Sequence, residues 1–257
     1  MLTALVREVS RSLGDCDLQH LARTPIDVDK AAAQHTLYCE RLAAMGATIL
    51  ALPARDDLPD SVFVEDAAIV VNEIAIMTRM RSPIRQNETA SVAEALARFR
   101  PLHWIEPPAT IEGGDVLRTG RNVFVGLSKR TNAAGVRELA RLLEPLGYLV
   151  TPVRLDGCLH LKTACCAIGD GRLLANRAWL DAAPLRGFEI VDVPAREPFA
   201  ANVLSAGGTV LVASCFPATQ ELLDKAGERV ISVDITELMK AEAGLTCMSI
   251  LLVTSTL

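Results

Sequence analysis

The 257-residue chain is poor in aromatic residues, which make up 4% of it, although 50% of its residues are hydrophobic. Its core must therefore be built from Ala, Val, Leu and Ile, a composition that suits closely packed strands and helices. The apolar runs are all shorter than the roughly 18–20 residues that a membrane helix needs, and the N-terminal segment acquires charge too early for a secretory signal. We expect a cytoplasmic protein with no membrane partner.

Basic runs and paired cysteines are missing as well. The net charge is −5 and there is no Lys/Arg-rich run, so we expect no nucleic-acid partner. The seven cysteines include no CxxC pair and no paired metal-ligand spacing. We therefore expect reduced thiols, with one of them a candidate reactive group.

One pattern recurs along the chain: two short apolar segments joined by a turn, which is typical of a β-hairpin. Helical periodicity follows most of these hairpins, and a further strand follows each helix. The turns lie at Asn72-Glu73, Gly120, Gly169 to Gly171 and Gly207-Gly208, and the helices at 89–99, 132–146 and 217–225. After the third hairpin, the short segment WLDAAPL stands in place of a full helix.

The two ends of the chain complete a fifth unit. Strands are predicted at 2–9 and 247–253, with a helix over about 29–45 and a strand at 47–52. Pairing the terminal strands closes a ring of five ββαβ modules. The sequence thus predicts a circular α/β architecture, and we expect residues 1–257 to form a single catalytic domain.

Chemically active residues recur near the start of the first strand of each module. These positions are separated by 42 to 48 residues and hold Glu65, Glu112, His160, Asn202 and Cys247. If the modules are related by pseudo-rotation, equivalent positions face one central axis. We therefore expect a cysteine, a histidine and several carboxylates to share one pocket.

This combination suggests a cationic substrate. A free cysteine, with a pKa of about 8.5, is only a few per cent thiolate at neutral pH and needs a partner such as His160. Neighbouring carboxylates would raise the thiol pKa further. A bound guanidinium resolves the conflict, because carboxylates bind it and its charge favours the thiolate. The pattern favours attack on an electron-poor carbon flanked by cationic nitrogens.

Structural alternatives exist for several of these residues. A lone cysteine in an apolar segment is usually a small buried hydrophobic residue, which is our interpretation of the other six cysteines. Asp115 could bond nearby backbone N–H groups after Gly113-Gly114. Arg85 and Arg130 lie in loops after second strands, where a solvated surface arginine is the ordinary outcome.

Four strings carry a family resemblance, and they lie in the right order along nearly the whole chain. LPDSVFVED (58–66), IEGGDVLRTGRNVFVGLSKRTN (111–132), LHLK (159–162) and AGLTCMSILL (243–252) resemble the dimethylarginine dimethylaminohydrolases of the pentein, or amidinotransferase-like, superfamily. The resemblance implies a five-bladed α/β-propeller. It also implies hydrolysis of Nω-methylated arginine, either asymmetric dimethylarginine or monomethylarginine, to citrulline and dimethylamine or methylamine, without metal or cofactor.

The resemblance also implies residue roles. Cys247 would be the nucleophile, His160 the general acid and then the general base, and Glu112 a support for the imidazole and the substrate nitrogens. Asp66 would bind the guanidinium with support from Glu65, and both arginines would bind the α-carboxylate, a task that suits a guanidinium fork. The matching positions for this carboxylate and for further substrate contacts are Arg85, Arg130, Asp60, Leu18 and Ala241, and the loop around Leu18 is a candidate lid.

Two alternatives to this function stay open. Arginine deiminases share the fold, the cysteine and the histidine, but they carry an Asp two residues after that histidine, where this chain has Lys162. Loss of that carboxylate leaves room for a methylated nitrogen and favours alkylated arginine. A non-catalytic propeller that binds a cationic ligand would need only the carboxylates and arginines. We expect a small cationic amino acid as the substrate, and a monomer or homodimer.

Overall fold

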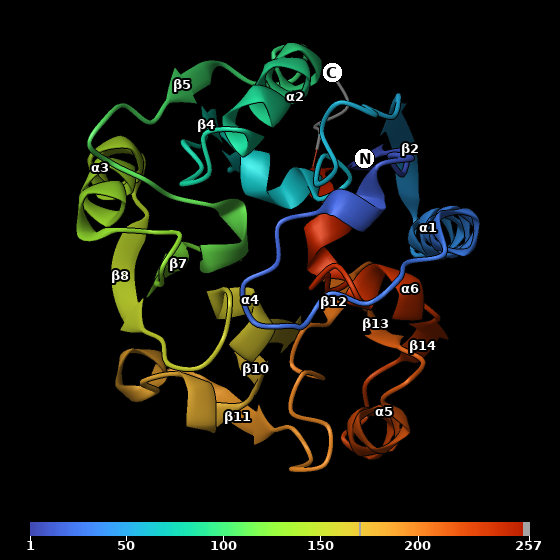
Figure 1. Cartoon of the computed structure of the whole chain (residues 1–257). Coiled ribbons are helices and arrows are strands. Elements are labelled where there is room, and N and C mark those ends of the chain that lie inside the picture. Colours follow the sequence, from blue (N-terminus) through green and yellow to red (C-terminus); the bar gives the residue numbers. More distant parts are fainter. Residues whose placement is uncertain (170, 254–257) are drawn as a thin grey trace.

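Five small sheets form a ring in the computed structural model, which describes residues 1–169 and 171–253 (Figure 1). Each sheet has three strands, the first two antiparallel and the third parallel to the middle one. The sheets are β15 (Ile250–Val253), β1 (Leu2–Arg7) and β2 (Ala47–Leu52); β3 (Ala68–Val70), β4 (Ala75–Met77) and β5 (Leu102–Trp104); β6 (Val116–Thr119), β7 (Asn122–Leu127) and β8 (Leu149–Arg154); β9 (Cys165–Gly169), β10 (Arg172–Ala175) and β11 (Glu189–Asp192); β12 (Leu204–Ala206), β13 (Thr209–Ala213) and β14 (Val230–Val233). The predicted five-bladed α/β-propeller is confirmed.

The ring closes through the two ends of the chain. Strand β15 pairs antiparallel with β1, with Leu2 opposite Val253 and Leu5 opposite Ile250. Strand β1 in turn pairs parallel with β2. The predicted pairing of the terminal strands is confirmed, and it converts a linear series of modules into a closed propeller.

The longer helices lie on the rim of the ring, each between the second and third strands of its sheet (Figure 1). They are α1 (Val28–Ala44), α2 (Thr89–Leu96), α3 (Ala133–Leu143) and α5 (Pro217–Lys225). The Asn132 side chain caps α3 by accepting from the Gly135 N–H at 2.8 Å, as Asn residues commonly do. Gly147, at a φ of +81°, ends the following turn in the left-handed conformation that glycine favours.

Some predicted boundaries differ from the structure. The helix predicted over 89–99 ends at Leu96, whose carbonyl accepts from the N–H groups of both Phe99 and Arg100 in a tighter turn before Pro101. The fourth blade has two short 3-10 segments, Arg177–Trp179 and Ala183–Leu185, in place of a helix, as its degenerate sequence predicts. The strand predicted from 247 begins only at Ile250, and the hairpin turn predicted at Gly169 to Gly171 includes residue 170, which lies outside the described residues.

The hydrophobic core lies between the blades. Among the described residues, five clusters of buried apolar side chains each join two neighbouring sheets. Leu5 is fully buried in the cluster that joins the closing sheet to the second blade, where it packs with Met77 and Leu252. Across the described residues, no helix is long and apolar enough to cross a membrane.

Leu5→Ala should lower the free energy of unfolding by about 2–5 kcal/mol, because it leaves a cavity in the cluster at the ring closure. Leu149→Ala is the matched control, since Leu149 is 60% exposed on β8 and should change the free energy by less than about 0.5 kcal/mol. Urea unfolding measures both. Equal losses in the two variants would contradict this description of the ring closure.

Candidate active site

The five residues at equivalent positions lie in the turns that precede the first strands. The turn η2 (Val64–Ala67) contacts both η4 (Gly113–Asp115) and η8 (Thr246–Met248), and the short helix α4 (Leu161–Ala164) contacts η4. Glu65 lies in η2 and Cys247 in η8. Glu112 and His160 directly precede η4 and α4, and Asn202 lies two residues before the start of β12. The turns that carry most of these side chains therefore contact one another, whereas a single pocket shared by Cys247, His160 and the carboxylates stays a prediction.

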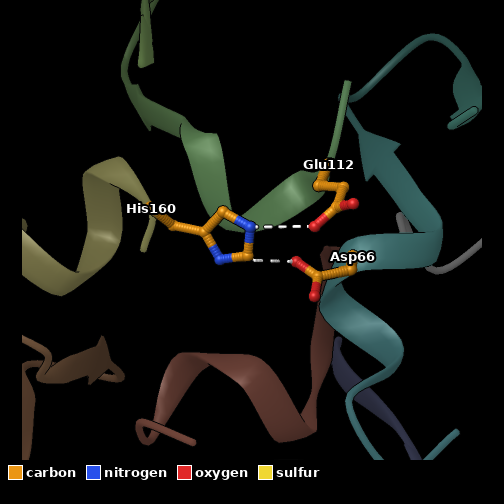
Figure 2. A group of neighbouring side chains, drawn as sticks. All are labelled: Asp66, Glu112 and His160. Carbon is orange, nitrogen blue, oxygen red and sulfur yellow. Dashed lines mark hydrogen bonds and ion pairs between the residues drawn. The ribbon is translucent and has the colours of Figure 1, made fainter. Parts of the chain in front are cut away.

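His160 faces two carboxylates, those of Glu112 and Asp66 (Figure 2). Its Nε2 is 2.9 Å from Glu112 Oε2, and its Nδ1 is 4.0 Å from Asp66 Oδ1. All three side chains are buried, and Glu112 is fully so. Gly114 makes the approach possible: its N–H donates to Asp66 Oδ1 at 3.0 Å, and a Cβ there would lie 2.5 Å from His160 Nδ1.

The two carboxylates keep the imidazole protonated. Burial by itself lowers the pKa of His160, but the charges of Asp66, Asp115 and Glu112 and the Glu112 hydrogen bond together outweigh it and raise the pKa to about 9. At neutral pH this ring is a cation that can donate a proton. The ligand atoms of Asp66, Glu112 and His160 also lie within 4.8 Å of one another, so these are the residues that could hold a metal ion. The expectation of a metal-free site stays a prediction.

Asp115 positions the backbone that carries His160. Its fully buried carboxylate accepts from the Leu161 N–H at 3.0 Å and from Ser128 Oγ at 2.6 Å. Burial raises its pKa to about 6. Asp115 therefore has a structural role, as the alternative stated for it predicted, but its backbone partner is the distant Leu161 N–H at the start of α4 rather than a group in its own turn.

Cys247 is half-buried, and its Sγ accepts a hydrogen bond from the Gly244 N–H at 3.3 Å. Burial is the main cause that raises the pKa of its thiol, and the charges of Glu65 and Asp66 add to it. The Gly244 hydrogen bond and the Lys162 charge act in the opposite direction and are weaker. The thiol is thus neutral in the free protein, as the sequence argument requires.

Glu65 joins the turns that carry the site. Its Oε1 accepts from Lys162 Nζ at 2.6 Å and its Oε2 from Thr246 Oγ1 at 2.8 Å. Lys162 also donates to the Gly113 carbonyl at 3.2 Å. Both Glu65 oxygens therefore have protein partners, and its support for a guanidinium stays a prediction.

Asn202 had no assigned role in the sequence argument, yet it connects two of the turns. Its Nδ2 donates to the Lys162 carbonyl at 2.9 Å, and its Oδ1 accepts from the Thr246 N–H at 3.1 Å. In the sequence, this role is indicated only by the position of Asn202, which is equivalent to those of the other four site residues in the repeat. Asn202 thus ties the segment after His160 to the segment that carries Cys247.

The surface-arginine alternative is wrong for both Arg85 and Arg130, which are buried. Arg85 Nε and Nη2 bond the two oxygens of Glu88 at 3.0 and 3.1 Å, and its Nη1 bonds Asp66 Oδ2 at 3.0 Å. Sequence reasoning missed Glu88, because a buried carboxylate three residues from an arginine looks like an ordinary surface helix pair.

Arg130 connects the site to the candidate lid. Its Nη2 is 3.1 Å from Asp17 Oδ2, its Nε donates to Gln19 Oε1 at 3.2 Å, and its Nη1 is 3.8 Å from Glu112 Oε1. On the other side, the Asp17 N–H donates to Asp60 Oδ2 at 3.1 Å. The lid thus contacts both an arginine and a carboxylate that the resemblance assigns to substrate.

A polar cavity of about 460 Å³ lies under this part of the lid and suits an anionic group, since three cations line it. Its lining residues are Asp17, Leu18, Gln19, Arg81, Ser82, Lys129 and Arg130. Leu18 lines this cavity, and its role as a substrate contact stays a prediction. Ala241 does not line it, because its side chain is buried in the core cluster beside Leu238.

Comparison with known proteins agrees with this geometry. A model of the arginine deiminase family matches residues 53–147. An N(G),N(G)-dimethylarginine dimethylaminohydrolase of Streptomyces coelicolor is 40% identical over 96% of this chain and 95% of its own length. That of Pseudomonas aeruginosa is 36% identical over 96% and 97%.

Solved structures agree as well. The Pseudomonas aeruginosa protein, as a cysteine-to-serine mutant complexed with citrulline, superposes with a TM-score of 0.93 at 34% identity over 98% of this chain and all of its own. The N-terminal domain of ArgZ, an arginine dihydrolase, shares the fold with a TM-score of 0.89 at 20% identity. Fold and site define a pentein hydrolase that acts on guanidino C–N bonds. Within that class, the chain belongs to the dimethylarginine dimethylaminohydrolase family.

The His160 ring should titrate near pH 9 in NMR spectra, and Glu112→Gln should lower its pKa by removing the hydrogen-bonded anion. Because the folded pKa exceeds the unfolded value of about 6.5, the stability that this cluster contributes is fully present below about pH 6.5. It is lost as the pH rises through about 9. The exposed His103 ring provides a reference signal. A His160 midpoint at or below 6.5 would refute the assignment.

Proposed function

We propose that this chain hydrolyses Nω-methylated arginines, namely asymmetric dimethylarginine and monomethylarginine, to citrulline and dimethylamine or methylamine. The observation that carries the proposal is the buried His160, held by Glu112 and Asp66 in the same group of turns as Cys247. Relatives that are 36% and 40% identical bear the corresponding name. Solved structures of the family include a citrulline complex and an adduct with S-methyl-L-thiocitrulline.

The reaction follows from the charges of the site. A guanidinium that enters beside Asp66 offsets the Glu65 and Asp66 charges that, together with burial, raise the pKa of the Cys247 thiol, and the thiol releases its proton to solvent. The thiolate attacks the guanidinium carbon and forms a C–S bond. His160 donates its proton to the methylated nitrogen as the C–N bond breaks and the amine leaves.

The second half of the reaction reverses the role of His160. A thiouronium group now links Cys247 to the rest of the substrate, and neutral His160 takes a proton from the attacking water. Collapse of the resulting intermediate breaks the C–S bond. The product oxygen gives its proton to the departing sulfur, which releases citrulline and restores the thiol, while His160 keeps the proton that it took from water. Glu112 stabilises the imidazolium in both half-reactions through its 2.9 Å hydrogen bond.

The remaining assignments extend this proposal. Asp66 binds the guanidinium, and Arg85 and Arg130 bind the α-carboxylate; the cations around the 460 Å³ cavity, Arg130 among them, support the placement of Arg130. Further substrate contacts are assigned to Asp60, Glu65, Leu18 and Ala241. We also propose one catalytic domain over residues 1–257, a cytoplasmic location and a monomer or homodimer, with no metal, cofactor, nucleic-acid or membrane partner.

Hydrolysis of free arginine is the second candidate, favoured by the arginine deiminase model that matches residues 53–147. Lys162 argues against it. Arginine deiminases carry an Asp at this position to bind the second terminal nitrogen, whereas Lys162 bonds Glu65 and the Gly113 carbonyl here. A dimethylated nitrogen has no N–H to donate to such an Asp. The absence of that carboxylate therefore favours methylated arginine over free arginine as the substrate.

Cys247→Ser should abolish citrulline formation from asymmetric dimethylarginine, with a loss of at least about 10³-fold, because the nucleophile is removed. A colorimetric citrulline assay measures it. Cys215→Ser is the matched control, since Cys215 is exposed and should keep full activity. An active Cys247→Ser variant that folds normally would eliminate Cys247 as the nucleophile.

The specificity constant, kcat/KM, should be higher for dimethylarginine and monomethylarginine than for free arginine, by about tenfold or more. That ratio corresponds to about 1.4 kcal/mol of differential transition-state binding. The same assay, run over a concentration series of each compound, measures it. A strong preference for free arginine would favour the deiminase instead.

A further inference from the structure

Glu242 makes an unusual contact with the lid, residues 17–24. Its carboxylate accepts hydrogen bonds from three consecutive backbone N–H groups, those of Gln19, His20 and Leu21. The Gln19 nitrogen is 3.0 Å from Oε2, and the Leu21 nitrogen is 2.6 Å from Oε1. Hydrogen bonds from successive backbone N–H groups to one carboxylate are strong because the acceptor is charged, and they fix the direction of the backbone.

The backbone of Glu242 is strained. It has a φ of +59°, and among the described residues it is the one non-glycine residue with a positive φ. A residue with a Cβ adopts this left-handed conformation at an energetic cost that glycine does not have. A strained backbone conformation persists only where surrounding contacts hold it in place. Here the strained residue is the same one whose carboxylate bonds the lid.

The second half of the lid is held by hydrogen bonds rather than by packing. Figure 1 shows the segment between β1 and α1 crossing the central opening of the ring. Beneath its second half lies a mainly apolar cavity of about 440 Å³, lined by His20, Leu21, Glu242 and Gly244 among others. Leu21 is 42% exposed. Burial thus contributes little here. Arg23 bonds the Gly14 and Cys16 carbonyls, and the Glu242 carboxylate binds the backbone of residues 19–21.

The first half of the lid is fixed on the opposite side, where Asp17 contacts Arg130 and Asp60. Leu18 stands between the two attachments and lines the 460 Å³ cavity. On the Glu242 side, Gly244 follows two residues later and donates its N–H to Cys247 Sγ. One short segment therefore holds both the lid and the thiol of the active site.

We propose that Glu242 is a positioning residue: it holds the lid closed over the substrate and so fixes Leu18, Asp17 and the lid contact of Arg130. The kinetic part of this proposal rests on the proposed function. Loss of the carboxylate leaves the reacting groups in place but lets the lid open. The substrate then binds more weakly, and KM rises more than kcat falls.

Three variants separate the carboxylate from the strain. Glu242→Gly removes the carboxylate and relieves the positive φ, because glycine adopts this conformation freely. Glu242→Ala removes the carboxylate and keeps the strain. Glu242→Gln keeps the shape and an accepting oxygen but loses the charge. Glu221→Gln is the matched control, on the exposed surface of α5 where Glu221 pairs with Lys225.

Amide hydrogen exchange of residues 19–21 is the first measurement, and it needs no turnover. Exchange should be at least about tenfold faster in Glu242→Gly and Glu242→Ala, intermediate in Glu242→Gln and unchanged in Glu221→Gln. Because Glu242→Gly removes strain, it should be at least as stable to heat as Glu242→Ala, so faster exchange in it reports the lid rather than a weakened fold. Unchanged exchange at residues 19–21 in Glu242→Gly would overturn the proposal.

Steady-state kinetics with asymmetric dimethylarginine are the second measurement. KM should rise by about tenfold in Glu242→Gly and Glu242→Ala, with a smaller change in kcat. Faster exchange together with wild-type KM would overturn the positioning role. If the wild-type chain forms no citrulline from any methylated arginine, the proposed function fails, whereas the hydrogen-exchange result still decides whether Glu242 holds the lid.

Discussion

The hydrogen bond between His160 and Glu112 is the interaction on which the site depends. It joins two turns from neighbouring blades, and it places a cation among carboxylates that would otherwise repel one another in a buried space. Asp66 shares this charge balance, because it contacts both His160 and Arg85. The cluster thus keeps an acid protonated at neutral pH, next to a thiol that stays neutral until another cation arrives.

The ring makes this arrangement possible. Each blade delivers one turn to the central axis, and the core clusters between adjacent blades hold the turns in register. Closure by β1 and β15 matters most for Cys247, because its turn lies directly before the last strand. Lys162 and Asn202 then connect turns that the sheets themselves do not join. The contacts between blades that stabilise the ring therefore also position the side chains of the site.

The repeated hairpins were sufficient to predict the ring, its closure and the contacts among most of the turns at Glu65, Glu112, His160, Asn202 and Cys247. They were not sufficient to place the strand start after Cys247, because a turn of three residues leaves no periodic signal. The partners Glu88 and Glu242 were missed for a related reason. Glu88 bonds Arg85, and Glu242 bonds three backbone N–H groups that are far away in the sequence. In the sequence alone, each of these carboxylates has the pattern of an exposed surface residue, because only the folded chain brings its partners close.

The proposed mechanism requires that the thiol of Cys247 ionises only when a cationic guanidinium enters the site. The ultraviolet absorbance of thiolate near 240 nm, taken as wild type minus Cys247→Ser at neutral pH, measures this ionisation. We expect no thiolate signal in the free protein and a signal of about one thiolate per chain when a slowly reacting guanidinium ligand binds. A full thiolate signal without ligand, or none with ligand at saturation, would contradict it.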